Sequence, residues 1–188
     1  MRIAYSSLAC PGWSVERIVD AAVRYGYDAI EWRLADGELL GPRTDDGVWD
    51  RIATCGVPAV CLDTSAVFVQ ASDDRRAKAV AMSTAMGERA QQIGAPAIRV
   101  FAGQVADDVD ADALVDPTRD ALAAAAATMP DGVALLIETH DAWSRGADVM
   151  RLASANGVGV VWDVAHSVRA GESPRESLAH IGVPGLVT

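Results

Sequence analysis

The stretch VALLIETHD, residues 133–141, decides the fold class of this chain. Its first five residues are apolar without interruption, and polar side chains begin at Glu138. A continuous apolar run is typical of a strand that is buried on both faces of a parallel sheet. The stretch VGVVWDVAH, residues 158–166, repeats the pattern, with Asp163 at the end of the apolar run and His166 three residues later. The two stretches predict neighbouring buried strands, each followed by a carboxylate and a histidine.

Similar short apolar runs recur along the whole chain, and segments with helical patterns separate them. The predicted strands cover residues 3–5, 29–32, 59–62, 97–101, 133–137 and 158–162, and a seventh begins at 186–188. Their spacing of about 25 to 38 residues suits repeated βα units, which build either an open doubly wound sheet or a closed barrel. No GxGxxG motif follows the first strand and no Walker lysine motif occurs, so we expect the barrel.

The length of the chain limits how much of a barrel can form. A (β/α)₈ barrel typically takes about 250 residues, whereas this chain has 188. We therefore predict an α/β fold of the TIM-barrel type that is incomplete, with about six βα units and the start of strand seven, in a single domain over residues 1–188. Unpaired edges of such a sheet favour self-association, so we expect a homo-oligomer that covers the open barrel edge.

Capping signals predict where several helices begin and end. Ser14 precedes an amphipathic segment that stops at Gly26. The pair at 116–117, aspartate followed by proline, resembles a cap with proline at the first helical position. Ser173, with Glu176 three residues later, fits a capping box.

The composition argues against several functional classes. The formal net charge is −10 and no basic stripe is visible, so we expect no nucleic-acid partner. No apolar run approaches the roughly 20 residues of a membrane span, and the N-terminus lacks a signal-peptide pattern, which predicts a cytoplasmic protein without membrane contact. Cys10, Cys55 and Cys61 lack CxxC spacing and predict neither a disulfide framework nor a zinc ribbon. Nucleophilic catalysis has no GxSxG motif to support it.

The chemistry is expected where the predicted strands end, because side chains converge at the carboxyl ends of parallel barrel strands. Glu138 is followed by His140, and Asp163 is followed by His166. Carboxylate oxygens and imidazole nitrogens at adjoining strand ends suit a divalent ion such as Mn²⁺, Mg²⁺, Co²⁺ or Zn²⁺. The alternative is structural: each carboxylate caps the next helix or forms an ion pair at the strand end.

Three further residues are candidates for lining a substrate pocket. Glu31 ends the second apolar run and either faces the pocket or fixes the barrel mouth through an ion pair. Arg99, in the fourth run, either contacts an anionic group or pairs with Glu31 or Glu138. Trp13 offers an apolar wall against a sugar ring, with ordinary loop packing as the alternative.

Four segments together resemble the sugar phosphate isomerase/epimerase family of the xylose-isomerase-like TIM-barrel superfamily. These segments are residues 31–33, 94–103, 137–141 and 162–166. The resemblance implies that Glu138 and Asp163 are metal ligands and that His166 contacts a substrate oxygen or a metal. The family's two other ligands, a histidine after strand seven and a glutamate after strand eight, have no counterpart in this sequence, which predicts impaired catalysis for these 188 residues alone.

The resemblance also implies an activity. It indicates a metal-dependent isomerase or epimerase that acts on a small sugar, sugar phosphate or hydroxy-carbonyl compound through an enediolate, in carbohydrate metabolism. Glu138 and His166 are the implied catalytic residues, and Glu31, Arg99, His140 and Trp13 the implied substrate contacts. Two alternatives stay open. One is a dehydratase of a cyclic polyol or keto acid on the same scaffold, and the other is a non-catalytic truncated barrel that only binds a ligand or partner.

Overall fold

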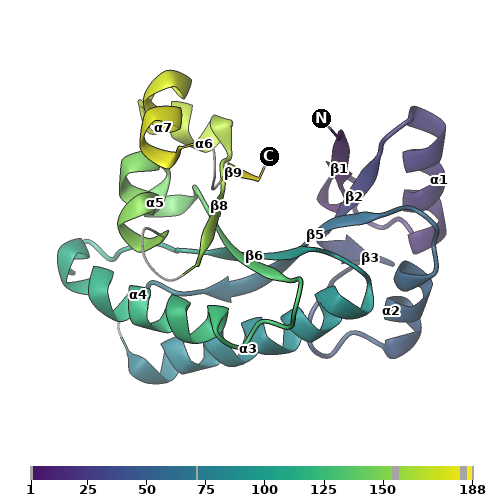
Figure 1. Ribbon diagram of the computed structural model, residues 1–188, viewed down its shortest axis with the longest axis horizontal. Coiled ribbons are helices and arrows are strands. Elements are labelled where there is room, and N and C mark those ends of the chain that lie inside the picture. Colours follow the sequence, from purple (N-terminus) through teal and green to yellow (C-terminus); the bar gives the residue numbers. More distant parts are fainter. Residues whose placement is uncertain (1, 71, 154–156, 183–185, 188) are drawn as a thin grey trace. The chain divides into compact units, whose positions relative to one another are not determined.

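The computed structural model describes residues 2–70, 72–153, 157–182 and 186–187 (Figure 1). Strands and helices mostly alternate along the chain. The strands are β1 (Ala4–Ser6), β2 (Ala29–Trp32), β3 (Leu34–Ala35), β4 (Glu38–Leu39), β5 (Ala59–Val67), β6 (Ala97–Phe101), β7 (Ala134–Glu138), β8 (Gly159–Val161) and β9 (Leu186–Val187). The helices are α1 (Val15–Tyr25), α2 (Asp46–Ala53), α3 (Asp73–Gln92), α4 (Ala111–Ala126), α5 (Gly146–Ala153), α6 (Val164–Arg169) and α7 (Pro174–Ile181), with short 3₁₀ helices η1 (Ser7–Ala9) and η2 (Asp141–Trp143). The alternation is interrupted where β2, β3 and β4 follow one another and where α7 follows α6.

The chain forms two compact units, and each is described by itself. The first comprises Met1–Thr64, Ala85–Ile98 and Pro130–Val133, and the second comprises Ser65–Thr84, Arg99–Met129 and Ala134–Thr188. In the first unit β1 pairs with β2 and β2 with β5, both in parallel, while β3 and β4 form a separate antiparallel pair. In the second unit β7 neighbours β6 and β8, and β9 pairs in parallel with β8.

Helix α1 illustrates how the local sequence builds the first unit. The Ser14 side chain accepts a hydrogen bond from the Arg17 N–H at 3.3 Å, and Gly26 ends the helix with a left-handed φ of 74°. Ile18 and Ala22 lie one turn apart on the same helix face and are fully buried. Both predicted ends of this helix are confirmed.

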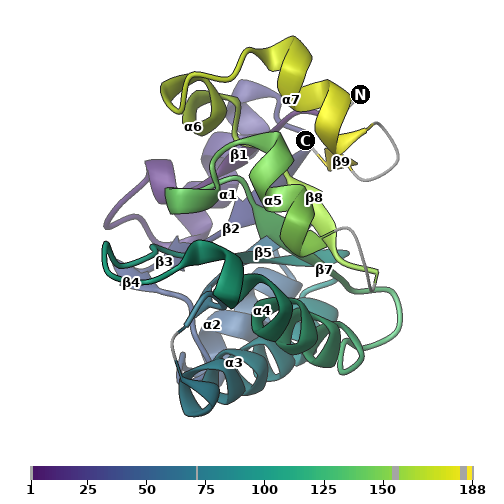
Figure 2. The same ribbon diagram turned by 90° about the vertical axis from the view of Figure 1, so that its left-hand side faces the viewer.

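The apolar run of β7 is the core of the second unit. Its three central residues, from Leu135 to Ile137, are almost completely buried, as the sequence predicts for a strand covered on both faces. Val149 and Leu152 of α5 are fully buried as well. Figure 2 shows α5 lying beside β7 and β8, which agrees with the contacts between these elements.

One predicted helix start is wrong. Helix α4 begins at Ala111, because the side chain of Asp110 accepts a hydrogen bond from the Asp112 N–H, and Pro117 lies inside the helix. A good cap before Pro117 and an alanine-rich run of strong helix formers after it outweigh the one backbone donor that proline lacks. The capping box of Ser173 and Glu176 is confirmed at the start of α7.

Further features of the described residues bear on the sequence predictions. Cys10, Cys55 and Cys61 form no disulfide bond within the described part of the chain. None of the helices in the described part of the chain combines the length and apolarity that a membrane span requires. The predicted start of a seventh strand is observed as β9, and Thr188 lies outside the described residues.

Candidate metal centre

Strand β7 ends in a carboxylate that is held by the neighbouring strand. Glu138 Oε2 lies 2.9 Å from Nε of Arg99 on β6, and the two side chains are only 12% and 7% exposed. The Arg99 guanidinium also lies over the ring of Phe101, 4.0 Å from the ring centroid. The ion pair between Arg99 and Glu138, one of the alternatives from the sequence, is therefore observed. Since a carboxylate has two oxygens, pairing through Oε2 is compatible with binding a cation through Oε1.

The surroundings of Glu138 oppose its ionisation. Burial raises the pKa of the Glu138 carboxyl above its ordinary value, although the Arg99 charge acts against that shift. Two histidines, His140 and His166, also act to lower this pKa, while the carboxylate of Asp163 acts to raise it. A divalent cation at this position would favour the ionised carboxylate in the same way as Arg99 does.

His140 follows β7 with extended backbone angles, φ −148° and ψ 159°. Its ring lies between two others, with centroids 4.7 Å from Phe101 and 4.3 Å from His166. Its Nδ1 atom is 3.0 Å from Oδ1 of Asp141, yet this buried nitrogen has no hydrogen-bond partner of acceptable geometry within the described chain. The distance is short enough for a hydrogen bond, but the angle is unsuitable because the ring N–H does not point along the line to Oδ1.

His166 lies in the first turn of α6, where Asp163 fixes it. Asp163 is the N-cap of this helix, and its Oδ1 accepts a hydrogen bond from the His166 N–H at 3.0 Å. The second carboxylate oxygen, Oδ2, lies 3.8 Å from Nε2 of the same histidine. The capping function that the sequence offered as the alternative for Asp163 is thus observed.

Thr139, which the sequence analysis did not single out, joins the ends of β7 and β8. Its hydroxyl accepts a hydrogen bond from the Asp163 N–H at 2.8 Å, and its own N–H donates to the Val161 carbonyl at 3.0 Å. The side chain is completely buried. The signal available in the sequence was a lone hydroxyl residue between the glutamate and the histidine of the same strand end.

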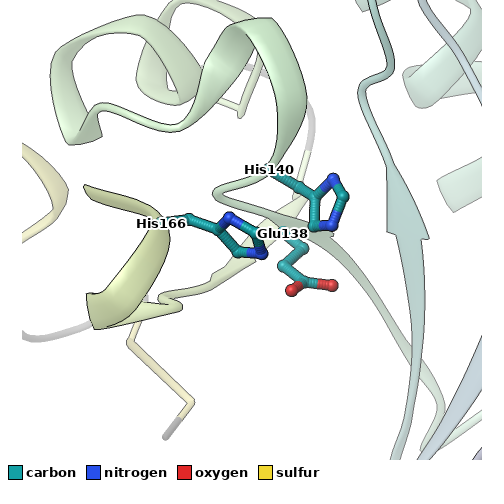
Figure 3. Close-up of side chains that lie close together, drawn as sticks. All are labelled: Glu138, His140 and His166. Carbon is teal, nitrogen blue, oxygen red and sulfur yellow. The ribbon is translucent and has the colours of Figure 1, made fainter. Parts of the chain in front are cut away.

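Glu138, His140 and His166 together form a group that can hold a metal ion. One ligand atom from each lies within 4.8 Å of the others. In Figure 3 a ring nitrogen of His140 faces the Glu138 carboxylate, and His166 reaches toward both from the side of α6. Ligand atoms about 2.1 Å from one cation are at most about 4.2 Å apart, so a small inward movement suffices for coordination. One carboxylate oxygen and two imidazole nitrogens form a donor set that fits a divalent transition metal.

The other predicted site residues lie outside this group. Asp163 adjoins it electrostatically but belongs to the helix cap. Glu31 and Trp13 belong to the first unit, where Glu31 is the last residue but one of β2 and is half-buried. The Arg17 guanidinium lies 4.2 Å above the Trp13 ring, which is a packing contact.

The sequence matches the model of one protein family, the xylose isomerase-like TIM barrel, over residues 19–184. The chain belongs to the xylose isomerase-like TIM barrel family. The fold class predicted from the alternating strands and helices is therefore confirmed, and so is the resemblance of the four segments.

Solved structures similar to this xylose isomerase-like chain agree with that assignment. A D-tagatose 3-epimerase-like protein matches with a TM-score of 0.78 and 16% identity, over 100% of this chain and 74% of that one. The IOLI protein with a binding zinc atom matches with a TM-score of 0.75 and 17% identity, over 95% and 68%. The probable 3-DHS dehydratase AsbF from Bacillus anthracis matches with a TM-score of 0.75 and 16% identity, over 99% and 71%. Identities this low show the fold alone.

The activity is not fixed by membership of the family. No protein with a curated function matches the sequence. The similar structures include an epimerase-like protein, a zinc-binding protein and a probable dehydratase. This xylose isomerase-like fold therefore carries more than one chemistry, and the choice among them depends on the site.

Proposed function

We propose that the chain is a metal-dependent isomerase or epimerase of a small sugar, sugar phosphate or hydroxy-carbonyl compound. One observation carries the proposal: Glu138, His140 and His166 bring one oxygen and two nitrogen ligand atoms within 4.8 Å of one another. The proposed ion is Mn²⁺, Mg²⁺, Co²⁺ or Zn²⁺. The two imidazole nitrogens suit Zn²⁺ and Co²⁺ best, whereas Mg²⁺ and Mn²⁺ are more often bound by oxygen ligands. The zinc atom in a structurally similar protein supports the same class of ion.

Each residue of this site has a proposed role. A bound divalent ion would polarise adjacent carbonyl and hydroxyl oxygens of a substrate. Glu138 is held by Arg99 and is proposed as a ligand and as a group that exchanges a proton with the substrate. His166, 28% exposed, is proposed to contact a substrate oxygen as well as the ion. Asp163 is proposed as a further ligand through Oδ2, since Oδ1 is already used by the helix cap.

Four substrate contacts are also proposed. Arg99 and His140 adjoin Glu138 and would meet a substrate that reaches this carboxylate. Glu31 and Trp13 stay proposals on the grounds given by the sequence, a charged strand end and an aromatic wall. A basic surface for nucleic acid has no support in the net charge of −10.

A dehydratase is the second candidate, because the probable 3-DHS dehydratase AsbF has a similar fold. Both reactions begin with removal of a proton next to a carbonyl group, so the same residues serve either. They differ in the next step, which is return of the proton in an isomerase or epimerase and loss of a β-hydroxyl in a dehydratase. A non-catalytic binding protein is the remaining alternative, because the ion pair of Arg99 and Glu138 could fix the strand ends without any role in catalysis.

Calorimetric titration with Mn²⁺, Co²⁺ and Zn²⁺ tests the metal site. We expect saturable binding by the wild type, a loss of at least an order of magnitude in affinity for Glu138→Gln and His140→Ala, and no change for His180→Gln, an exposed histidine outside the group. Equal affinity in all four proteins, or no saturable binding by folded wild type, would refute the site.

Solvent deuterium exchange then tests the chemistry. The metal-loaded protein is incubated in deuterated buffer with a panel of ketoses, aldoses and hydroxy-keto acids, and the products are followed by NMR. Deuterium beside the carbonyl with an isomer as product identifies an isomerase or epimerase. Formation of an unsaturated carbonyl product identifies a dehydratase. Metal binding without exchange in any compound of the panel would favour the binding protein.

A further inference from the structure

We infer that Asp141, anchored by Gln104, is a positioning residue that fixes the His140 ring so that Nε2 is its ligand atom. The inference rests on the proposed function in one respect only, namely that the ligand group binds a metal. It extends that function to two residues outside the group, and it makes a statement about the His140 tautomer that is testable without any metal.

His140 Nδ1 lies in a buried environment next to a carboxylate. This nitrogen is buried, lies 3.0 Å from Asp141 Oδ1, and has no properly aligned hydrogen-bond partner among residues 2–70, 72–153 and 157–182. A buried polar nitrogen without a bond is costly. A small rotation of the ring about its attachment brings an Nδ1–H into line with the carboxylate. His140 and Asp141 have 29% and 23% of their side chains exposed, so water only partly competes for this bond.

The Asp141 carboxylate is itself held in place by its neighbours. Gln104 Nε2 donates a hydrogen bond to the same oxygen, Asp141 Oδ1, at 2.8 Å. The Ser144 hydroxyl donates to the Asp141 carbonyl at 2.8 Å and fixes the turn. The backbone of Asp141 has a φ of 54°, in the left-handed region, where aspartate, asparagine and glycine are tolerated best. The carboxylate is therefore held from its side chain and from its backbone.

The position of the Asp141 carboxylate determines which nitrogen of His140 is available to an ion. If Nδ1 carries the proton and donates to Asp141, then Nε2 carries the lone pair. Figure 3 shows one ring nitrogen of His140 facing the Glu138 carboxylate and the other facing away. A carboxylate behind a histidine ligand fixes the ring orientation and raises the basicity of the nitrogen that binds the ion.

A purely structural role for Asp141 makes a different prediction. As an ordinary turn residue it would affect stability through its backbone conformation and leave the tautomer of His140 unchanged. Asp141→Gly keeps the left-handed backbone and removes the carboxylate, while Asp141→Asn keeps the backbone and an oxygen acceptor but removes the charge. Comparison of these two variants separates the side chain from the turn.

The experiment is ¹⁵N NMR of histidine-labelled, metal-free protein at about pH 8, where an ordinary imidazole is neutral. The sequence contains three histidines, so the spectrum is simple, and His180 is an internal control. We expect His140 as the Nδ1–H tautomer in the wild type, the Nε2–H tautomer in Asp141→Gly, and largely restored Nδ1–H in Asp141→Asn. Gln104→Ala is expected to shift the tautomer in the same direction as Asp141→Gly, by less.

Metal titration of the same proteins completes the test. Asp141→Gly is expected to weaken metal binding about 10–100-fold, with partial rescue in Asp141→Asn. An Nε2–H tautomer in the wild type, or an unchanged tautomer in Asp141→Gly, overturns the inference. Wild type that shows the expected tautomers but no metal binding supports the hydrogen bond and counts against the proposed function, so the two failures are distinguishable.

Discussion

Thr139 Oγ1 accepts a hydrogen bond from the backbone N–H of Asp163 at 2.8 Å, and this bond ties the end of β7 to the end of β8. Glu138 and His140 flank Thr139 in the sequence, while Asp163 begins the helix that carries His166. The buried hydroxyl therefore links the two segments from which the ligand group is assembled.

Thr139→Val is expected to weaken both the fold and the metal site. Valine has nearly the same shape, but it leaves the Asp163 N–H without its acceptor, which costs about 1–3 kcal/mol of unfolding free energy. Urea unfolding measures this loss, and metal titration measures the loosening of the ligand group. Thr139→Ser keeps the hydroxyl and is the control. A loss in the serine variant with no loss in the valine variant would show that the methyl group, not the hydroxyl, matters.

Asp163 is expected to show separable effects on stability and on metal affinity. Asparagine is as good an N-cap as aspartate, so Asp163→Asn should keep the hydrogen bond to the His166 N–H and change stability by no more than about 0.5 kcal/mol. Asp163→Ala removes the cap and should cost about 0.5–2 kcal/mol. If Oδ2 also binds the ion, both variants lose metal affinity. Unchanged affinity in Asp163→Asn would leave only the capping role.

The sequence predicts the elements of this fold better than the contacts at its strand ends. The run at 97–101, which is apolar except for Arg99, is observed as β6 with the same limits. The start of α4 cannot be predicted from Pro117 alone. The residue that caps the helix is Asp110, seven positions before the proline.

The candidate site is only partly predictable for a related reason. Glu138 and His166 follow from their places after two apolar runs. The choice between His140 and Asp163 as third member depends on which side chain the next helix uses for its cap, and strand periodicity carries no information about that. Thr139 and Gln104 act through hydrogen bonds to residues distant in the sequence, which a linear pattern cannot indicate.

Gly103→Ala is expected to destabilise the protein through a steric clash. A Cβ at this position would lie 2.4 Å from Cγ1 of Val67, and the glycine has a φ of 109°. We expect a loss of about 1–3 kcal/mol in unfolding free energy from the clash, in addition to the backbone strain. Gly132→Ala measures the strain alone, since its φ is 84° and nothing lies within 4 Å.

The double variant Val67→Ala/Gly103→Ala isolates the clash. Removing the Val67 methyl groups should recover most of the difference between Gly103→Ala and Gly132→Ala. Urea unfolding of the wild type, the double variant and the single variants Val67→Ala, Gly103→Ala and Gly132→Ala measures this recovery. Strict additivity of the two substitutions at 67 and 103 would mean that the contact does not determine the effect. Because Gly103 directly precedes Gln104, we also expect the clash to weaken the hydrogen bond to Asp141.

Glu172 is expected to make the stability of the second unit depend on pH in the acidic range. Glu172 is 8% exposed, and its carboxylate accepts hydrogen bonds from the Gly146 N–H at 2.7 Å and from the Ser177 hydroxyl. Burial alone raises the pKa of Glu172, but the hydrogen bonds from Ser177, Gly146 and Ala147 and the charge of His180 together outweigh it, so the net pKa is lower than the ordinary 4.5. A lowered folded-state pKa means that the folded protein binds the proton less readily than the unfolded chain does.

The sign of the pH effect depends on that difference. The stabilisation from Glu172 is present above its ordinary pKa of 4.5 and is lost as the pH falls through the lower, folded-state value. Glu172→Gln should therefore lower the unfolding free energy by about 1.5–3 kcal/mol at neutral pH. Urea unfolding repeated down to about pH 3 should show this difference from the wild type becoming smaller. Glu88→Gln, at an exposed position of α3, controls for the loss of one negative charge. If the difference in unfolding free energy between the wild type and Glu172→Gln stays constant over this range, the hydrogen bonds of Glu172 do not depend on its ionisation. A charged acceptor, in contrast, loses its advantage over glutamine when it is protonated.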